Sequence, residues 1–245
     1  MTQDTICDIQ TQQHSLMKTI RAVLLLTLFI GGAICLCSLS RADETNNKAA
    51  TAAGTGEKLV FHTDWKGERI ELPPPFAPEM KLKGIEVIRF APGMFNAQSD
   101  SFFTYAFVFS VSKDQNLTQE VIQREILAYY RGLAKAILKN KGTAADVDKF
   151  TFRLEQAKEA TGTPEKVSAS AKFTQYTGEL AWVEPFVTAK PQVLHFEIQS
   201  WADPATSRNY MFVCTSPKIR GETDETWKDL RKIRRSFEVN GGVGK

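Results

Sequence analysis

The stretch FFTYAFVFSV, residues 102 to 111, most constrains the fold because it is apolar on both faces of an extended chain. Successive side chains of a strand point to opposite sides of a sheet. One side of this stretch carries Phe103, Tyr105, Phe107, Phe109 and Val111, and the other carries Phe102, Ala106 and Val108. Such a strand lies inside a sheet that is covered on both faces. We therefore expect a central strand here, with another layer on each side.

Two helices are expected from apolar residues that recur every three or four positions. The longer helix runs from about residue 117 to 140, with Asn116 able to cap its start and Gly142 able to close its end. Gly132 lies inside it and costs about 1 kcal/mol relative to alanine unless another segment packs there. The shorter helix covers residues 224 to 237, and its apolar stripe consists of Trp227, Leu230, Ile233 and Phe237.

The rest of the chain from residue 58 consists mostly of short strand patterns. Strands are expected in KLVFHT, ERIEL, GIEVIRF, residues 149 to 155, KVSASAKFTQY, AWVEPFV, QVLHFEIQSWA and NYMFVCTS, with GEL and DPATSRN as turns. Strands followed by a long helix, more strands and a closing helix indicate an α+β fold. We expect one domain over residues 58 to 240, mainly an antiparallel sheet covered by the long helix and the C-terminal helix.

The N-terminal region has the features of an export signal. An apolar block from about residue 22 to 39 follows Lys18 and Arg21, and Ser40 and Ala42 supply the small side chains for cleavage before Asp43. The alternative is an uncleaved membrane anchor, since about 18 apolar residues are near the minimum for a span. Lipid attachment is not favoured, because bulky residues precede both cysteines of the block.

The signal also indicates how the remainder is organised. Residues 1 to 16 are polar and do not fit a signal, so translation is expected to start at Met17. Residues 43 to 57 are small and polar, as in a flexible leader. The mature protein is then periplasmic or secreted, and Cys214 is its single thiol, which lies in an apolar stretch and is expected to be buried and structural.

The final strands and helix resemble a known family. A hairpin that leads into YMFVCTS and then TWKDLRKIRRSFEV, with Ser236 and Phe237 at its end, is similar to the closing part of PsbP-like domains. The resemblance covers roughly the last 75 residues and rests on pattern. It implies a non-catalytic binder or accessory factor in an exported compartment, and it implies no site residue.

Candidate catalytic residues are few. The chain has no common catalytic or metal-binding motif, and no metal or cofactor is expected. His195 and Glu197 share one face of a predicted strand about 7 Å apart, which suits an acid–base pair or equally a histidine on a wet sheet face beside a carboxylate. His62 and Asp64 form a second small cluster, for which a strand end that runs into a turn is the simpler interpretation.

Three further features suggest binding surfaces. The basic positions Lys228, Arg231, Lys232, Arg234 and Arg235 suit either the dipole at the end of a helix or contact with an anionic surface. The aromatic strand at 102 to 111 suits either a core or an apolar ligand pocket. Asn116-Leu117-Thr118 is a glycosylation sequon, which a eukaryotic host is able to use.

The sequence therefore favours an exported, non-catalytic binding or accessory domain. Its expected partner is an unidentified envelope protein or a small apolar ligand. A formal net charge of +3 is too small to indicate nucleic acid, and membrane contact is not favoured. Two alternatives stay open at this point. One is a hydrolase-like enzyme that uses His195 and Glu197, and the other is a membrane-tethered envelope protein that retains residues 22 to 39.

Overall fold

The computed structural model describes residues 50–51, 58–158, 162–165, 167 and 171–240. The expected start at Met17, the apolar block and the cleavage site between Ala42 and Asp43 lie outside the described residues. Of the expected leader, the described part is Ala50–Thr51, which forms strand β1.

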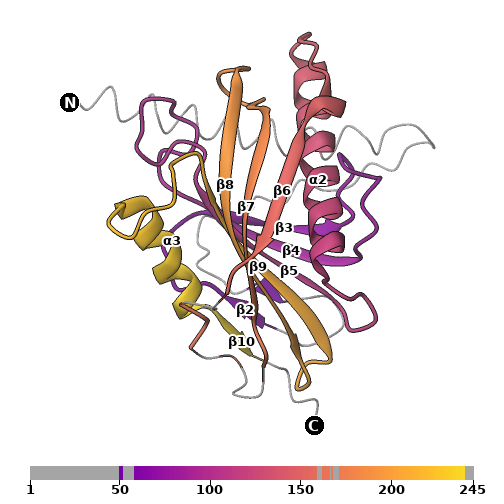
Figure 1. Cartoon of the computed structure of the whole chain (residues 1–245), viewed down its shortest axis with the longest axis vertical. Helices are drawn as coiled ribbons and strands as arrows, with labels where there is room; N and C mark the ends of the chain where they lie inside the picture. Colours follow the sequence, from indigo (N-terminus) through magenta and orange to yellow (C-terminus); the bar gives the residue numbers. More distant parts are fainter. Residues whose placement is uncertain (1–49, 52–57, 159–161, 166, 168–170, 241–245) are drawn as a thin grey trace, which may run out of the picture. The chain divides into compact units, whose positions relative to one another are not determined.

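Among the described residues, the chain forms a large antiparallel sheet with two α-helices, so the predicted α+β class is confirmed (Figure 1). The sheet has the order β3-β4-β5-β9-β8-β7-β6, and each neighbouring pair is antiparallel. Its strands are β3 (Gly67–Leu72), β4 (Gly84–Phe90), β5 (Tyr105–Ser112), β6 (Thr151–Gln156), β7 (Thr174–Val183), β8 (Pro191–Asp203) and β9 (Arg208–Ser216). The expected DPATSRN turn joins β8 to β9.

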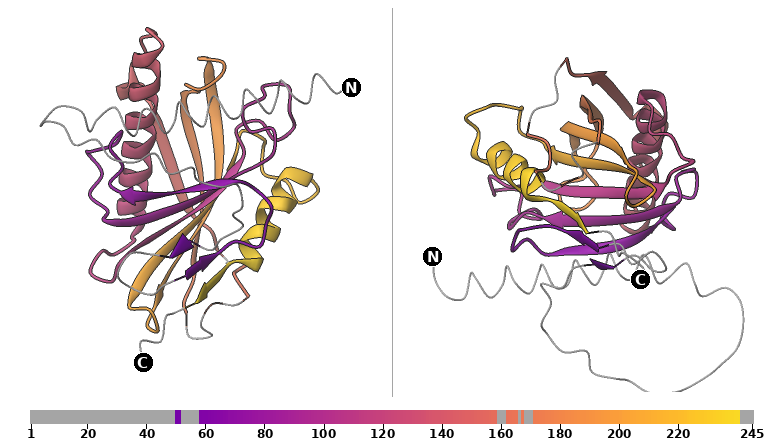
Figure 2. Two further views of the ribbon diagram at one scale, coloured as in Figure 1. Left: turned by 180° about the vertical axis from the view of Figure 1, so that it is seen from behind. Right: turned by 90° about the horizontal axis from the view of Figure 1, so that it is seen from below.

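Strand β5 lies inside the sheet between β4 and β9, as its two apolar faces predict. Every residue from Tyr105 to Val111 is buried. On one face, Phe107 and Phe109 contact Tyr129 of helix α2, which spans Gln119–Asn140. On the other face, Ala106 and Val108 join a core cluster with residues of helix α3. Figure 2 shows the two helices separated by the strands of the sheet.

Helix α2 begins two residues later than predicted, and its cap is Thr118 instead of Asn116. The Thr118 side chain accepts a hydrogen bond from the backbone N–H of Val121 at 3.4 Å, which satisfies one of the unpaired donors at a helix start. Gly132 does have a packing role. A Cβ at this position would lie 2.3 Å from the carbonyl oxygen of Phe76, so the glycine lets the preceding loop cross the helix closely.

The predicted turn at GEL is wrong, because β7 continues without interruption through residues 178 to 180. Gly178 is a close-approach position inside the strand. A Cβ there would lie 2.8 Å from the ring of Phe152 on β6, and that ring packs against Phe196 on β8 with a centroid distance of 5.1 Å. A glycine in a strand interior often marks such an approach, and here it was mistaken for a chain reversal.

Helix α3 spans Glu225–Ser236, and the side chain of Asp224 caps its start. The four residues of its predicted apolar stripe are all buried in one cluster with β5, β8 and β9. A smaller sheet contributes residues to the same core cluster. It has the order β1-β2-β10, where β2 is Lys58–Val60 and β10 is Glu238–Asn240, and Leu59 of β2 is fully buried.

Candidate functional site

His195 and Glu197 both lie on β8 and face the same side of the sheet, as strand alternation predicts. Their cross-strand neighbours differ. His195 is opposite Glu179 of β7 and Ser216 of β9, whereas Glu197 is opposite Cys214 of β9. The two residues consequently belong to separate polar clusters, each with its own charged partners.

Glu197 is held by two arginines of α3. Arg231 donates from Nη2 to Oε1 at 2.6 Å and from Nε to the same oxygen at 3.0 Å, and Arg234 donates from Nη1 to Oε2 at 2.9 Å. Burial by itself would raise the pKa of Glu197, but the hydrogen bonds and charges of Arg231 and Arg234 outweigh it and lower the pKa below its ordinary value. Glu197 is therefore an ionised anchor for α3, with both carboxylate oxygens engaged.

His195 pairs with Glu179 instead of Glu197. Its Nδ1 lies 3.2 Å from Glu179 Oε1, and Arg220 Nη2 lies 4.0 Å from the same oxygen. Burial and the charge of Arg220 lower the pKa of His195 more than Glu179 raises it, so the imidazole is neutral at pH 7. Arg220 is fixed in turn by hydrogen bonds from Nη1 to the carbonyls of Gly178 at 2.9 Å and Phe196 at 3.4 Å.

The five cations of the basic run divide into two groups. Arg234 is fully buried, and besides Glu197 it binds the carbonyl of Gly162 at 3.0 Å. Arg231 is turned toward the sheet by Glu197 and by the carbonyl of Gly221 at 2.9 Å. The other three, Lys228, Lys232 and Arg235, are exposed. The five positions therefore do not form one solvent-facing basic surface.

A second surface lies on the same side of the sheet as His195, toward the β6 edge, and we call it the open face. It consists of Arg153 on β6, Glu179 and Ala181 on β7, and Val193 and His195 on β8. Cross-strand pairing places Arg153, Glu179 and His195 in one row and Ala181 beside Val193. Each of these residues is exposed except His195, which is partly exposed.

Two exposed apolar side chains accompany these polar groups. Val193 is 45% exposed within the open face, and Ile219, which immediately precedes Arg220, is 78% exposed. Most large aliphatic side chains of the described residues are buried in the core, so Val193 adds exposed apolar contact area beside the polar groups of the open face.

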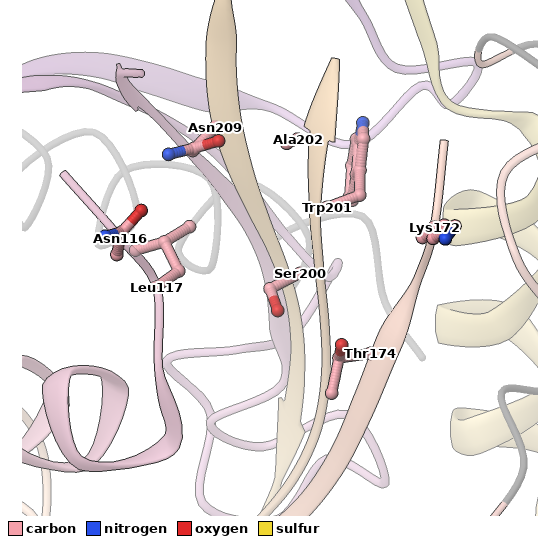
Figure 3. Close-up of a pocket in the computed structure, with 8 residues that line it drawn as sticks. All are labelled: Asn116, Leu117, Lys172, Thr174, Ser200, Trp201, Ala202 and Asn209. Atoms are coloured by element: carbon pink, nitrogen blue, oxygen red, sulfur yellow. The ribbon is translucent and has the colours of Figure 1, made fainter. Parts of the chain in front are cut away.

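A small pocket lies on the opposite face of the sheet, beside the start of α2 (Figure 3). Its volume is about 190 Å³, and it is lined by Asn116, Leu117, Lys172, Thr174, Ser200, Trp201, Ala202 and Asn209. The aromatic side chains of β5 do not line it; they pack against each other and against α2 in the core. The lining is mainly polar, which does not suit the apolar ligand considered from the sequence.

The remaining candidates have structural roles. Cys214 is a buried free thiol that donates to the carbonyl of Leu230 at 3.5 Å, and burial raises its pKa to about 12, so it is an unreactive core residue as predicted. His62 pairs with Glu238 at 2.6 Å and so connects the end of β2 to β10. No group of three or more metal-ligating side chains occurs among the described residues.

In the part of the chain that the structure describes, no helix is both long and apolar enough to cross a membrane.

No protein-family model matches the chain, and no curated protein matches it.

Sequence reasoning identified His195 and Glu197 but missed their partners. Glu179 lies on β7, whose register on β8 is set by long-range pairing. Arg220 lies in the loop between β9 and α3. The sequence did not distinguish Arg231 and Arg234 from the exposed Lys228, because all three lie one position after a residue of the apolar stripe. Side chains at such positions border the buried face of a helix, and the Glu197 carboxylate on β8 turns Arg231 and Arg234 inward.

Proposed function

We propose that this protein is an exported, non-catalytic binding domain whose open face contacts a protein partner. The observation that carries the proposal is the exposed Val193 on the same sheet face as Glu179 and His195, with Arg220 beside Glu179 and the exposed Ile219 next to Arg220 in the chain. Protein interfaces combine apolar contact area with arginine and with polar groups that fix orientation. The partner surface we expect has an apolar side chain next to a carboxylate, which would face Arg153.

Catalysis by His195 and Glu197 is the less favoured alternative. Both oxygens of Glu197 accept hydrogen bonds from Arg231 and Arg234, so this carboxylate has no role as a free base. His195 is neutral and lies on a sheet face, while the 190 Å³ pocket lies on the other face. A hydrolase needs its base and its substrate cavity on the same side.

The opposite side of the sheet has a different role in this proposal. We propose that α2 covers the face that carries the aromatic residues of β5, which leaves the open face as the surface for a macromolecule. Supporting contacts come from Tyr130, whose ring lies 5.1 Å from Trp182 and 5.7 Å from Phe196, as centroid distances. Side chains of α2 also protect the β6 edge, since Gln119 binds the carbonyl of Leu154 at 2.7 Å.

Export and the PsbP-like resemblance belong to the same proposal. The resemblance of the closing strands and helix suggests an accessory role in an exported compartment, and the partner would then be an envelope protein. Contact of Lys228, Lys232 and Arg235 with an anionic membrane is not favoured, because three exposed cations give a weak surface charge and Lys228 pairs with Glu225 at 2.6 Å. The intact mass of the native protein tests export: a start at Asp43 is expected, and a mass that retains residues 17 to 42 would mean a tethered protein.

The binding proposal is tested by crosslinking in the native host. In one variant, a photoreactive amino acid replaces Val193. In a matched variant, it replaces Lys139, an exposed residue of α2 that is not part of the open face. We expect one discrete crosslinked protein from position 193 and none from position 139. The same adduct should vanish when Ile219→Glu and Arg153→Glu are added. Equal adducts from both positions, or persistence in the charge-reversed variant, would contradict the proposal.

A further inference from the structure

The pocket beside the start of α2 has a floor of small and medium-sized side chains. Its floor consists of Thr174 and Ser200, which are cross-strand partners on β7 and β8, and of Ala202 and Asn209, which are partners on β8 and β9. Helix α2 begins at Gln119 and does not extend over this end of the sheet. The small side chains beyond the helix therefore leave the hollow, and Leu117 forms its wall (Figure 3).

The wall is held in place by hydrogen bonds, so the pocket exists before any ligand arrives. Asn209 Nδ2 donates to the carbonyls of Lys113 at 3.2 Å and Gln115 at 3.0 Å, and so fixes the connection between β5 and α2. Gln115 is fixed on its other side, since its Oε1 accepts from the backbone N–H of Lys83 at 2.7 Å and its Nε2 donates to the carbonyl of Lys83 at 2.8 Å. A preformed site loses little conformational entropy on binding.

The lining chemistry defines the ligand class. Lys172 is the single ionisable side chain among the eight lining residues, so an anion finds a partner there and a cation does not. Thr174 supplies a hydroxyl group that donates or accepts, Ser200 supplies a hydroxyl oxygen whose proton is shared with Tyr176, and Leu117 supplies apolar surface for a short carbon chain. A volume of about 190 Å³ equals about six times the liquid volume of one water molecule, which suits a small metabolite.

We propose that this pocket binds a small 2-hydroxycarboxylate. The carboxylate pairs with the Lys172 ammonium, the ligand hydroxyl accepts from Thr174 and donates to the Ser200 oxygen, and the carbon chain lies against Leu117. This site is independent of the open face, because its floor lies on the opposite side of the sheet. Failure of one proposal leaves the other unaffected.

The test is an amide-detected NMR titration of the folded protein with L-lactate as the probe. We expect saturable shifts confined to residues around 116–118, 172–174, 200–202 and 209, with a roughly millimolar Kd, as suits a ligand of about six heavy atoms. Acetate keeps the charge but lacks the hydroxyl, and 1,2-propanediol keeps the hydroxyl but lacks the charge. Both should bind about tenfold more weakly, the size of one lost hydrogen bond to a charged group.

Three variants complete the test. Lys172→Met should weaken lactate about tenfold, whereas Lys190→Met, an exposed lysine in the β7–β8 connection, should change nothing. Ala202→Leu fills the pocket from an exposed position and should abolish the local shifts. Equal lactate affinity in the Lys172 and Lys190 variants, shifts spread over the whole domain, or no saturable shift in the starting protein would each overturn the proposal.

Discussion

Arg234 donates from Nη1 to Oε2 of Glu197 at 2.9 Å, and both side chains are buried between α3 and the sheet. This pair joins the C-terminal helix to β8, and Arg231 joins it from the rim. The orientation of α3 on the sheet therefore depends on a charge pair as well as on the apolar stripe of Trp227 and Leu230. Removing either partner leaves the other charge buried without its counter-ion, which costs much more than the intact pair contributes.

Glu197→Gln should lower the free energy of unfolding by about 3–5 kcal/mol at pH 7, the usual cost of breaking a buried pair. Because the pKa of Glu197 is lowered in the folded state, its stabilisation is full above the ordinary glutamate pKa and is lost as pH falls through the folded value. The difference between variant and wild type should therefore shrink in acid. Urea unfolding at neutral and acidic pH measures both effects. Glu155→Gln on the exposed side of β6 is the control, and an equal loss in the two variants would contradict the role of the pair.

Glu86→Gln should remove a loss of stability that occurs as pH rises. Glu86 is fully buried on β4, its Oε1 accepts from the Tyr129 hydroxyl at 3.3 Å, and burial raises its pKa from 4.5 to about 8. The folded state keeps this proton after the unfolded chain has lost it, so wild-type stability should decline between pH 4.5 and about pH 8. Urea unfolding across this window should show a shallower decline for Glu86→Gln. Glu79→Gln, in an exposed loop, is the control. If the stability of Glu86→Gln declined with pH as steeply as that of Glu79→Gln, the role of Glu86 would be contradicted.

Gly132→Ala should destabilise the protein although alanine is the better helix former. The new Cβ would lie 2.3 Å from the Phe76 carbonyl oxygen and 2.7 Å from Ala77 Cα, both of which are backbone atoms that cannot rotate away. We expect a net loss of about 1–3 kcal/mol, the usual cost of overpacking. Thermal or urea unfolding measures it. Lys135→Ala, an exposed position in the same helix, should be close to neutral, and a gain in stability for Gly132→Ala would show that the Phe76 loop moves freely.

Thr118→Ala should cost about 1 kcal/mol, since it removes the side-chain cap on the Val121 N–H. Asn116→Ala is the matched control and should change stability by less than about 0.5 kcal/mol, because Asn116 lies outside the cap. Chemical unfolding of the two variants distinguishes them directly. A larger loss for Asn116→Ala would support the sequence interpretation over the structure.

Local patterns predicted the elements well where short-range periodicity decides them. The β4 strand, the two-sided burial of β5 and the apolar stripe of α3 all follow from side-chain alternation or helical spacing. Gly178 was misinterpreted because the reason for the glycine, the Phe152 ring, is contributed by another strand. The same limit applies to the site. Glu179 becomes the partner of His195 only through the register of β7 on β8, which no local pattern contains.

The pairing of β5 with β9 also dictates the order in which the fold is able to form. Strand β5 is followed by α2 and three more strands before its second neighbour appears in the chain. During synthesis, β5 therefore has β4 on one side and an unpaired apolar edge on the other until Ser216 has emerged. An unpaired apolar strand readily joins other chains, and such non-local pairing is slow to form. The incomplete chain therefore exposes an aggregation-prone edge that the finished domain no longer has, and this exposure lasts until β9 pairs with β5.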